Sequence, residues 1–308
     1  MPVFQIHHIT SYEYDHPVRE SNNQIRIYPF ADANQEILSH RLSLSHKESP
    51  IEQYTDYFGN TVGVFNVLES HNELVIDSHL VVRTKKAKAF QTPAAAAPAR
   101  DASRDLRLLD YSQPEKIQAQ NEITSILDAA GIANSSSAET VFRCSAFIFN
   151  NFQYIKGITD VETTVDEILA HRSGVCQDFA HVLLQLLRTA GIPARYVSGY
   201  ICPNKDGVRG EGATHAWVEA WLPGQGWAGI DPTNNIWVED THVKLAVGRH
   251  FSDCTPMKGA FKGPANQHLS VFVSVAYENG HVAKDHTQVQ IQRGVTTVHP
   301  PRESAAQQ

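Results

Sequence analysis

The stretch RSGVCQDFAHVLLQLLRTA, residues 172–190, decides how the rest of the chain is arranged. Apolar residues recur along it at helical spacing, at positions 179, 183, 186, 187 and 190. This pattern predicts a helix that packs one face on a core. Ser173 and Gly174 suit a capped helix start. The sequence therefore predicts a central helix that begins close to Cys176.

Cys176 lies about one helical turn before Phe179 and Ala180, so its sulfur shares the inward stripe of the helix. Backbone N–H groups and the positive end of the helix dipole favour a thiolate there. The same N–H groups can stabilise an oxyanion on an attacked carbonyl. The alternative is a plain buried cysteine, because free Cys is among the most buried residue types. A base and an orienting group elsewhere in the chain decide between the two.

The whole chain has 308 residues, long enough for two domains or for one domain with a large addition. Its 26 Lys and Arg against 33 Asp and Glu give a net charge of −7. No basic run stands out, so we expect no nucleic-acid partner. Residues 1–20 show no signal peptide, and no stretch approaches the ~18 continuous apolar residues of a bilayer span. We therefore expect a cytoplasmic protein without a membrane partner.

Four cysteines, at positions 144, 176, 202 and 254, are irregularly spaced and form no CxxC pair. This spacing argues against a disulfide framework and against a zinc knuckle. We expect Cys144, Cys202 and Cys254 to be structural.

Alternating apolar residues fill residues 1–86 and predict several short strands, typical of an all-β sandwich domain. His7 and His8 are adjacent on a strand, so they face opposite ways and cannot bind one metal ion together. Residues 87–114 are rich in Ala and Pro and are expected to form a linker.

Residues 115–295 are expected to form the catalytic domain, with residues 296–308 as a flexible tail. Three helical segments lead into the central helix, which ends at Gly191. The strands that follow are expected at 194–201, 214–222 and 226–230, and a later hairpin turns at Asn279-Gly280.

The hairpin around residues 223–226 brings His215 opposite or diagonal to Asp231 on one face of the sheet. Neighbouring strands lie only ~5 Å apart. A carboxylate at 231 can therefore fix the imidazole tautomer and aim its other nitrogen at a partner. Trp217 and Glu219 share this face, which is therefore predicted to form the wall of a site. The alternative for Trp217 is that its ring only fills space in the core.

Three separate blocks of the sequence resemble the motifs of the bacterial transglutaminase-like superfamily. They are Cys176-Gln177-Asp178, Thr214 to Glu219 and Gly226 to Thr233. The segments 191–200 and 248–253 also match this family. The resemblance covers about residues 117–263.

This resemblance implies an α+β fold, in which a papain-like core of helices packed on an antiparallel sheet follows the β-sandwich domain. It further implies that Cys176 attacks an amide carbonyl, that His215 acts as base and then acid, and that Asp231 orients His215. Gln177, Trp217 and Gly212 are the expected substrate contacts, and the glycine-rich loop 202–213 is either a flap or a plain surface loop. No dense acidic loop appears, so we expect no calcium and no other cofactor.

The expected partner is a peptide or protein amide substrate. Its acyl intermediate is resolved either by an amine, as in a transglutaminase, or by water, as in a protease or amidase. A non-catalytic peptide-binding module is the alternative function, and a metal site at Cys176, His181 and His215 is a weaker one. The oligomeric state does not follow from the sequence.

Overall fold

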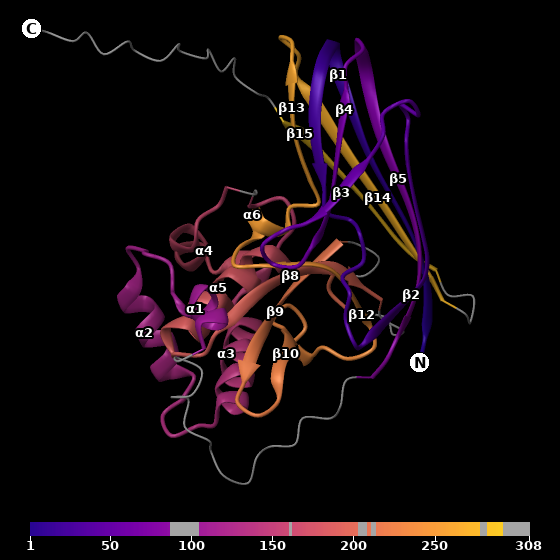
Figure 1. The fold of residues 1–308 in the computed structure, drawn as a ribbon. Coiled ribbons are helices and arrows are strands. Elements are labelled where there is room, and N and C mark those ends of the chain that lie inside the picture. Colours follow the sequence, from indigo (N-terminus) through magenta and orange to yellow (C-terminus); the bar gives the residue numbers. More distant parts are fainter. Residues whose placement is uncertain (87–104, 160–161, 203–207, 211–213, 278–281, 292–308) are drawn as a thin grey trace, which may run out of the picture.

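The structure, a computed structural model, describes residues 1–86, 105–159, 162–202, 208–210, 214–277 and 282–291. The fold is α+β and has three layers: helices, a five-stranded antiparallel sheet, and a longer sheet that contains the N-terminal strands (Figure 1). Among the described residues, no helix is both long and apolar enough to cross a bilayer.

The longer sheet contains eight strands: β1 (Val3–Ile25), β2 (Gln35–Leu44), β3 (Glu52–Thr55), β4 (Thr61–Val67), β5 (His71–Thr84), β13 (Met257–Lys262), β14 (Gln267–Tyr277) and β15 (Val282–Ile291). The first half of β1 pairs with β5 and β14, and its second half pairs with β4 and β13. The strands that pair with the two halves of β1 contribute to one apolar cluster, for example Leu74 of β5 and Phe65 of β4. The expected sandwich of short strands is therefore a continuous sheet that folds over through β1.

The C-terminal limit of the predicted catalytic domain, residue 295, is corrected by these pairings. Strands β13 and β14 pair with β1, and β15 pairs with β14, so residues 257–291 extend the N-terminal sheet. Val273 and Val275 of β14 share an apolar cluster with Phe4 and Ile6 of β1. The alternation of residues 269–277 predicts a strand, but the sheet that it joins is decided by which apolar face it covers. The turn predicted at Asn279-Gly280 lies outside the described residues.

The helical layer consists of η2 (Leu106–Leu108), α1 (Leu109–Ser112), α2 (Gln120–Ala129), α3 (Ser137–Asn151), α4 (Val165–His171), α5 (Cys176–Thr189) and α6 (Phe251–Cys254). Ser136 caps α3, because its side chain accepts a hydrogen bond from the backbone N–H of Glu139. Gly131 follows α2 with φ +65°, the left-handed conformation that favours glycine at a helix end. Helix α5 lies at the centre of the apolar core, as its stripe predicts.

The predicted linker, residues 87–114, is partly helical. Residues 87–104 lie outside the described part of the chain, but Leu106–Leu108 and Leu109–Ser112 form η2 and α1. Tyr111 is buried and packs its ring edge-on against Trp227. The end of this segment therefore belongs to the domain that contains the middle sheet, because Tyr111 packs on that sheet.

The middle sheet contains β8 (Ala194–Ile201), β9 (Thr214–Leu222), β10 (Gly226–Asp231), β11 (Ile236–Trp237) and β12 (His242–Gly248), in the order β11-β10-β9-β8-β12. Two short strands, β6 (Gln153–Tyr154) and β7 (Ser173–Gly174), pair in parallel as a separate sheet. One face of β9, from Ala216 to Leu222, joins the core built around α5.

The N-terminal domain covers the other face and the β12 edge of this sheet. Tyr200 and Leu245 from the middle sheet pack with Phe4 and Ile6 from β1. At the edge, the side-chain amide of Asn60 donates to the carbonyl of Val247 at 2.7 Å and accepts from its N–H at 2.8 Å. Gln35 makes the same pair of bonds to Lys244. Side chains thus replace the missing neighbouring strand.

Candidate active site

Cys176 is the first residue of α5 and is partly exposed. The helix starts there and not at Ser173-Gly174, which form the short strand β7. Asp178, in the first turn, accepts a hydrogen bond from the backbone N–H of Val175 at 2.7 Å and from the hydroxyl of Thr159 at 2.6 Å. The carboxylate therefore caps the start of the helix, where the first N–H groups have no partner within the helix.

His215 and Asp231 form a buried pair, since the side chains of both are fully inaccessible to solvent. Nε2 of His215 lies 2.9 Å from Oδ2 of Asp231. The hairpin register pairs Gly226 with Leu222 and Ile230 with Val218, which places His215 diagonal to Asp231. This is one of the two registers that the sequence predicts.

The charges in this pair shift both pKa values. Burial by itself lowers the pKa of His215, but the charges of Asp231 and Cys176 outweigh it and raise the pKa to about 10. Burial by itself raises the pKa of Asp231, but His215 and His242 together hold it well below its usual range. The site therefore favours a protonated imidazole beside an ionised carboxylate at neutral pH.

Cys176 and His215 line one small cavity of about 80 Å³, together with Gln177. Gly210 lies close to the ring, because a Cβ built on it would stand 2.8 Å from Nδ1 of His215. Gly210 also has φ +82°, so this position is strained for any other residue. The three predicted catalytic residues and the predicted contact Gln177 thus gather at one place.

Two further side chains hold Asp231, and the sequence analysis missed both. Asn234 donates to Oδ2 at 2.8 Å, and Nε2 of His242 lies 3.5 Å from the same oxygen. The turn Asp231-Pro232-Thr233-Asn234 is a signal that could have revealed Asn234, since Asn side chains in turns bond to nearby groups. His242 has no such local signal, because the pairing of β12 with β8 brings it to the site.

Trp217 is not a substrate contact in this structure, and its predicted role is corrected. It is 1% exposed and packs edge-on against His242, with the ring centroids 5.1 Å apart. A Cβ at Gly199 would stand 2.7 Å from the Trp217 ring, so the ring fills the space that this glycine leaves. Phe30 and Phe58 of the N-terminal domain pack on this cluster, so the Trp217 ring belongs to an inner layer and not to the wall of an open site.

The predicted contact Gly212 lies outside the described residues, but part of the same loop is described. The backbone N–H of Arg209 donates to Oδ1 of Asn234 at 2.9 Å, and Nδ2 of Asn234 donates to the Arg209 carbonyl at 3.1 Å. Asn234 therefore connects the loop to the carboxylate that orients His215.

The weaker prediction of a metal site at Cys176, His181 and His215 has no geometric support. Among the described residues, two clusters have metal-binding spacing, His7-Asp77-His79 and His215-Asp231-His242, and neither includes Cys176 or His181. His181 accepts a hydrogen bond from the N–H of Phe251 at 3.3 Å, and burial lowers its pKa to about 3. It is a neutral residue of the core.

Comparisons with known proteins agree with this arrangement. Residues 128–232 match the Transglutaminase-like superfamily, and residues 4–83 match the Bacterial transglutaminase-like N-terminal region. An uncharacterised protein of Mycobacterium leprae is 31% identical over 271 residues, which cover 87% of this chain and 96% of that protein. The chain belongs to the bacterial transglutaminase-like superfamily.

Other relatives of this transglutaminase-like protein differ in how much they share with it. An uncharacterised protein of Mycobacterium tuberculosis is 30% identical over 291 residues, covering 88% of this chain and 92% of its own. A protein-glutamine gamma-glutamyltransferase of Pseudomonas aeruginosa is 37% identical over 83 residues, covering 25% of this chain and 12% of its own. A crystal structure of a proposed cysteine protease from Cytophaga hutchinsonii shares the fold, with a TM-score of 0.68 and 21% identity over 93% of this chain and 98% of that one.

Proposed function

We propose that this transglutaminase-like protein is an enzyme that transfers an acyl group from a glutamine-type peptide amide to a primary amine, through a thioester on Cys176. The observation that carries this proposal is the buried pair of His215 and Asp231 beside a cavity that it shares with Cys176. Such a pair has no structural need to sit next to an accessible thiol. It is the arrangement that activates a nucleophile.

In the first step, the Cys176 thiolate forms a bond to the amide carbonyl carbon, and the C–N bond of the amide breaks. Imidazolium at His215 gives its proton to the leaving nitrogen, which departs as ammonia or an amine. In the second step, neutral His215 takes a proton from the incoming amine as its nitrogen attacks the thioester carbonyl. The C–S bond then breaks and restores the thiolate. Water in place of the amine gives hydrolysis.

The start of α5 supports the charge that develops on the carbonyl oxygen. Backbone N–H groups of the first helical turn have no partner within a helix. Asp178 caps this turn by accepting a hydrogen bond from the backbone N–H of Val175. We propose the N–H of Cys176 as one oxyanion donor, which is the role that helix N-termini fill in acyl transfer.

A second, larger cavity supports a peptide as substrate. It has about 500 Å³ and shares Thr214, Phe251 and Pro256 with the small cavity at Cys176. Its far side comes from the N-terminal sheet and from residues 257–261, with aromatic side chains such as Tyr12 and Phe261. Among the described residues that line it, Lys258 is the charged one at neutral pH. A large apolar side chain near the reacting glutamine fits this lining.

The amine acceptor is favoured by the relative from Pseudomonas aeruginosa, which is described as a protein-glutamine gamma-glutamyltransferase. A non-catalytic binding module needs no buried imidazole and carboxylate pair at its cavity. The two acceptors, amine and water, are distinguished by the products.

The test is incubation of the protein with a glutamine-containing peptide library and a fluorescent primary amine. We expect amine incorporation, which Cys176→Ala and prior treatment with iodoacetamide both abolish. Iodoacetamide should label Cys176 first, because the other three cysteines are buried. Cys202→Ala is the matched control and should keep the activity. Equal incorporation by Cys176→Ala would refute the proposal, whereas ammonia release without incorporation would indicate hydrolysis.

A further inference from the structure

A cluster of three potential metal ligands lies on the N-terminal sheet, away from Cys176. In the register of β1 and β5, His7 pairs directly with His79. Asp77 is two residues from His79 on β5, so it points to the same face. His7 is separated from the other two by 70 residues or more in the sequence. The pairing of β1 with β5 brings the three residues together.

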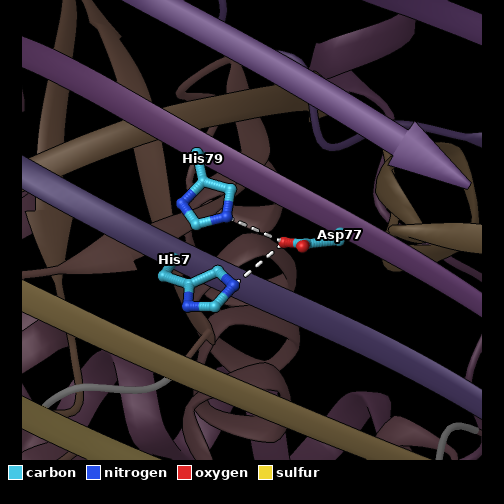
Figure 2. A group of neighbouring side chains, drawn as sticks. All are labelled: His7, Asp77 and His79. Atoms are coloured by element: carbon cyan, nitrogen blue, oxygen red, sulfur yellow. Dashed lines mark hydrogen bonds and ion pairs between the residues drawn. The ribbon is translucent and has the colours of Figure 1, made fainter.

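The three side chains converge on one point (Figure 2). Nε2 of His7 lies 2.9 Å from Oδ1 of Asp77, and Nε2 of His79 lies 3.2 Å from the same oxygen. The two imidazole rings stack with centroids 4.0 Å apart and an interplanar angle of 16°. The three ligand atoms all lie within 4.8 Å of one another. Ligand atoms around a tetrahedral zinc ion are separated by about 3.3 Å, since each lies ~2.0 Å from the metal.

The cluster is accessible to an ion from solvent. Its side chains are 34%, 42% and 35% exposed for His7, His79 and Asp77. His8, the next residue, points to the opposite face and is buried, with Nδ1 2.8 Å from the hydroxyl of Tyr200. The pair His7-His8 therefore gives one imidazole to the interface between the two domains and one to the outer face.

The charges also favour a cation at this point. One carboxylate faces two stacked imidazoles, and two imidazolium ions at that separation would repel each other. Neutral imidazoles that share a divalent ion with the carboxylate avoid this repulsion.

We propose that His7, Asp77 and His79 bind one divalent transition-metal ion of the zinc, copper or nickel class. Two imidazole nitrogens and one carboxylate oxygen suit these metals, whereas calcium and magnesium prefer oxygen ligands alone. Three protein ligands leave a coordination position for water or an external ligand. The ion would cross-link β1 and β5, two central strands of the N-terminal sheet.

The test uses tag-free, chelator-treated full-length protein, titrated with Zn²⁺ in a calorimeter and with Co²⁺ in a visible spectrophotometer. We expect one zinc ion per chain at this site, cobalt bands of low-symmetry coordination, and a raised Tm with zinc. Asp77→Asn and His79→Ala should each weaken zinc binding by about tenfold or more, because a ligand is lost.

The matched control is His16→Ala. His16 also lies beside a carboxylate, with Nδ1 3.0 Å from Oδ1 of Asp15, but this pair belongs to neither candidate metal cluster among the described residues. The His16→Ala variant should bind zinc with the same affinity as the unaltered protein. His7→Gln, which keeps a polar side chain of similar reach, serves if His79→Ala fails to fold, as judged by circular dichroism. Zinc binding that is unchanged in Asp77→Asn and His7→Gln would overturn the proposal, as would the absence of binding by the unaltered protein.

Discussion

At the scale of single residues, the candidate active site centres on the carboxylate of Asp231. It accepts hydrogen bonds from His215 and from the backbone N–H of Thr233, the latter at 2.9 Å, and from Asn234. His215 and His242 keep it ionised against the effect of burial, and its pKa lies well below the usual range. One oxygen, Oδ2, therefore fixes the imidazole tautomer. The same oxygen is connected to the loop at Arg209 through the hydrogen bonds of Asn234.

Replacing this carboxylate should disable the proposed reaction and leave the fold intact. Asp231→Asn keeps the size of the side chain but removes the charge that holds His215 protonated on Nε2. We expect the rate of amine incorporation to fall by about 10³- to 10⁴-fold, the scale seen when the acid of a catalytic triad is neutralised. Steady-state rates with a glutamine peptide measure this, and circular dichroism checks the fold. A loss of less than tenfold would contradict the role of Asp231.

At the scale of secondary-structure elements, β12 is the edge strand of the middle sheet. Side-chain amides of the N-terminal domain bind the backbone groups that have no neighbouring strand. Asn60 is fully buried and bonds to both backbone groups of Val247. Buried backbone groups without partners are costly. The turn at residues 56–60 therefore serves to dock one domain on the other.

Asn60→Ala should lower the free energy of unfolding by about 1–3 kcal/mol, because it leaves the N–H and the carbonyl of Val247 unsatisfied. Urea unfolding followed by tryptophan fluorescence measures this change. The matched control is Asn66→Ala, which removes only an exposed hydrogen bond to Asn22 at 2.7 Å and should cost about 0.5 kcal/mol or less. Equal effects of the two variants would show that the amide docking does not stabilise the protein.

Individual elements could be predicted well where their signal is local. The strand 194–201 and the strand 214–222 have the expected bounds. β12 was missed, because all of its residues are buried and no alternation marks it. Trp217 was assigned to the substrate because its face carries ionisable groups, but those groups are satisfied by partners from other strands.

At the scale of the whole molecule, a buried ionic network joins the sheet to the N-terminal domain. Oε2 of Glu219 accepts a hydrogen bond from Nε of Arg195 at 2.7 Å, and its Oε1 lies 2.5 Å from Nζ of Lys244. Lys244 also pairs with Asp32 of the N-terminal domain. Burial by itself raises the pKa of Glu219, but the two cations lower it from 4.5 to about 2.

This network predicts how stability depends on pH. The folded pKa of Glu219 is below its unfolded value, so the ionised carboxylate stabilises the fold above pH 4.5 and that stability is lost as the pH falls towards 2. Urea midpoints measured from neutral to acid pH should fall through this window. Glu219→Gln should be less stable at neutral pH and show a shallower fall. A variant whose midpoint falls as steeply as that of the unaltered protein would contradict this assignment.

The cavity between the two domains predicts a role for the N-terminal sheet and its C-terminal strands in substrate binding. Phe261→Ala removes an aromatic ring that lines it. We expect KM to rise by about tenfold for a peptide with a large apolar residue next to glutamine, because part of a buried side chain loses its contact. KM for a minimal glutamine amide should not change. Leu68→Ala, at a side chain 71% exposed and outside this cavity, is the control. If Phe261→Ala left KM unchanged for the apolar peptide as well as for the minimal amide, the cavity would be excluded as a binding site.

The sequence by itself determined the central helix, most strands of the middle sheet, the cysteine at the helix start and the face shared by His215 and Asp231. These features depend on periodicity and turn geometry over about ten residues, which a single sequence displays. Only the tertiary structure decided that β14 joins β1, that Trp217 is buried, that Asn234 and His242 hold Asp231, and that His7 meets His79. The physical reason is that such contacts depend on which apolar faces cover one another, and residues far apart in the chain carry no local mark of that choice.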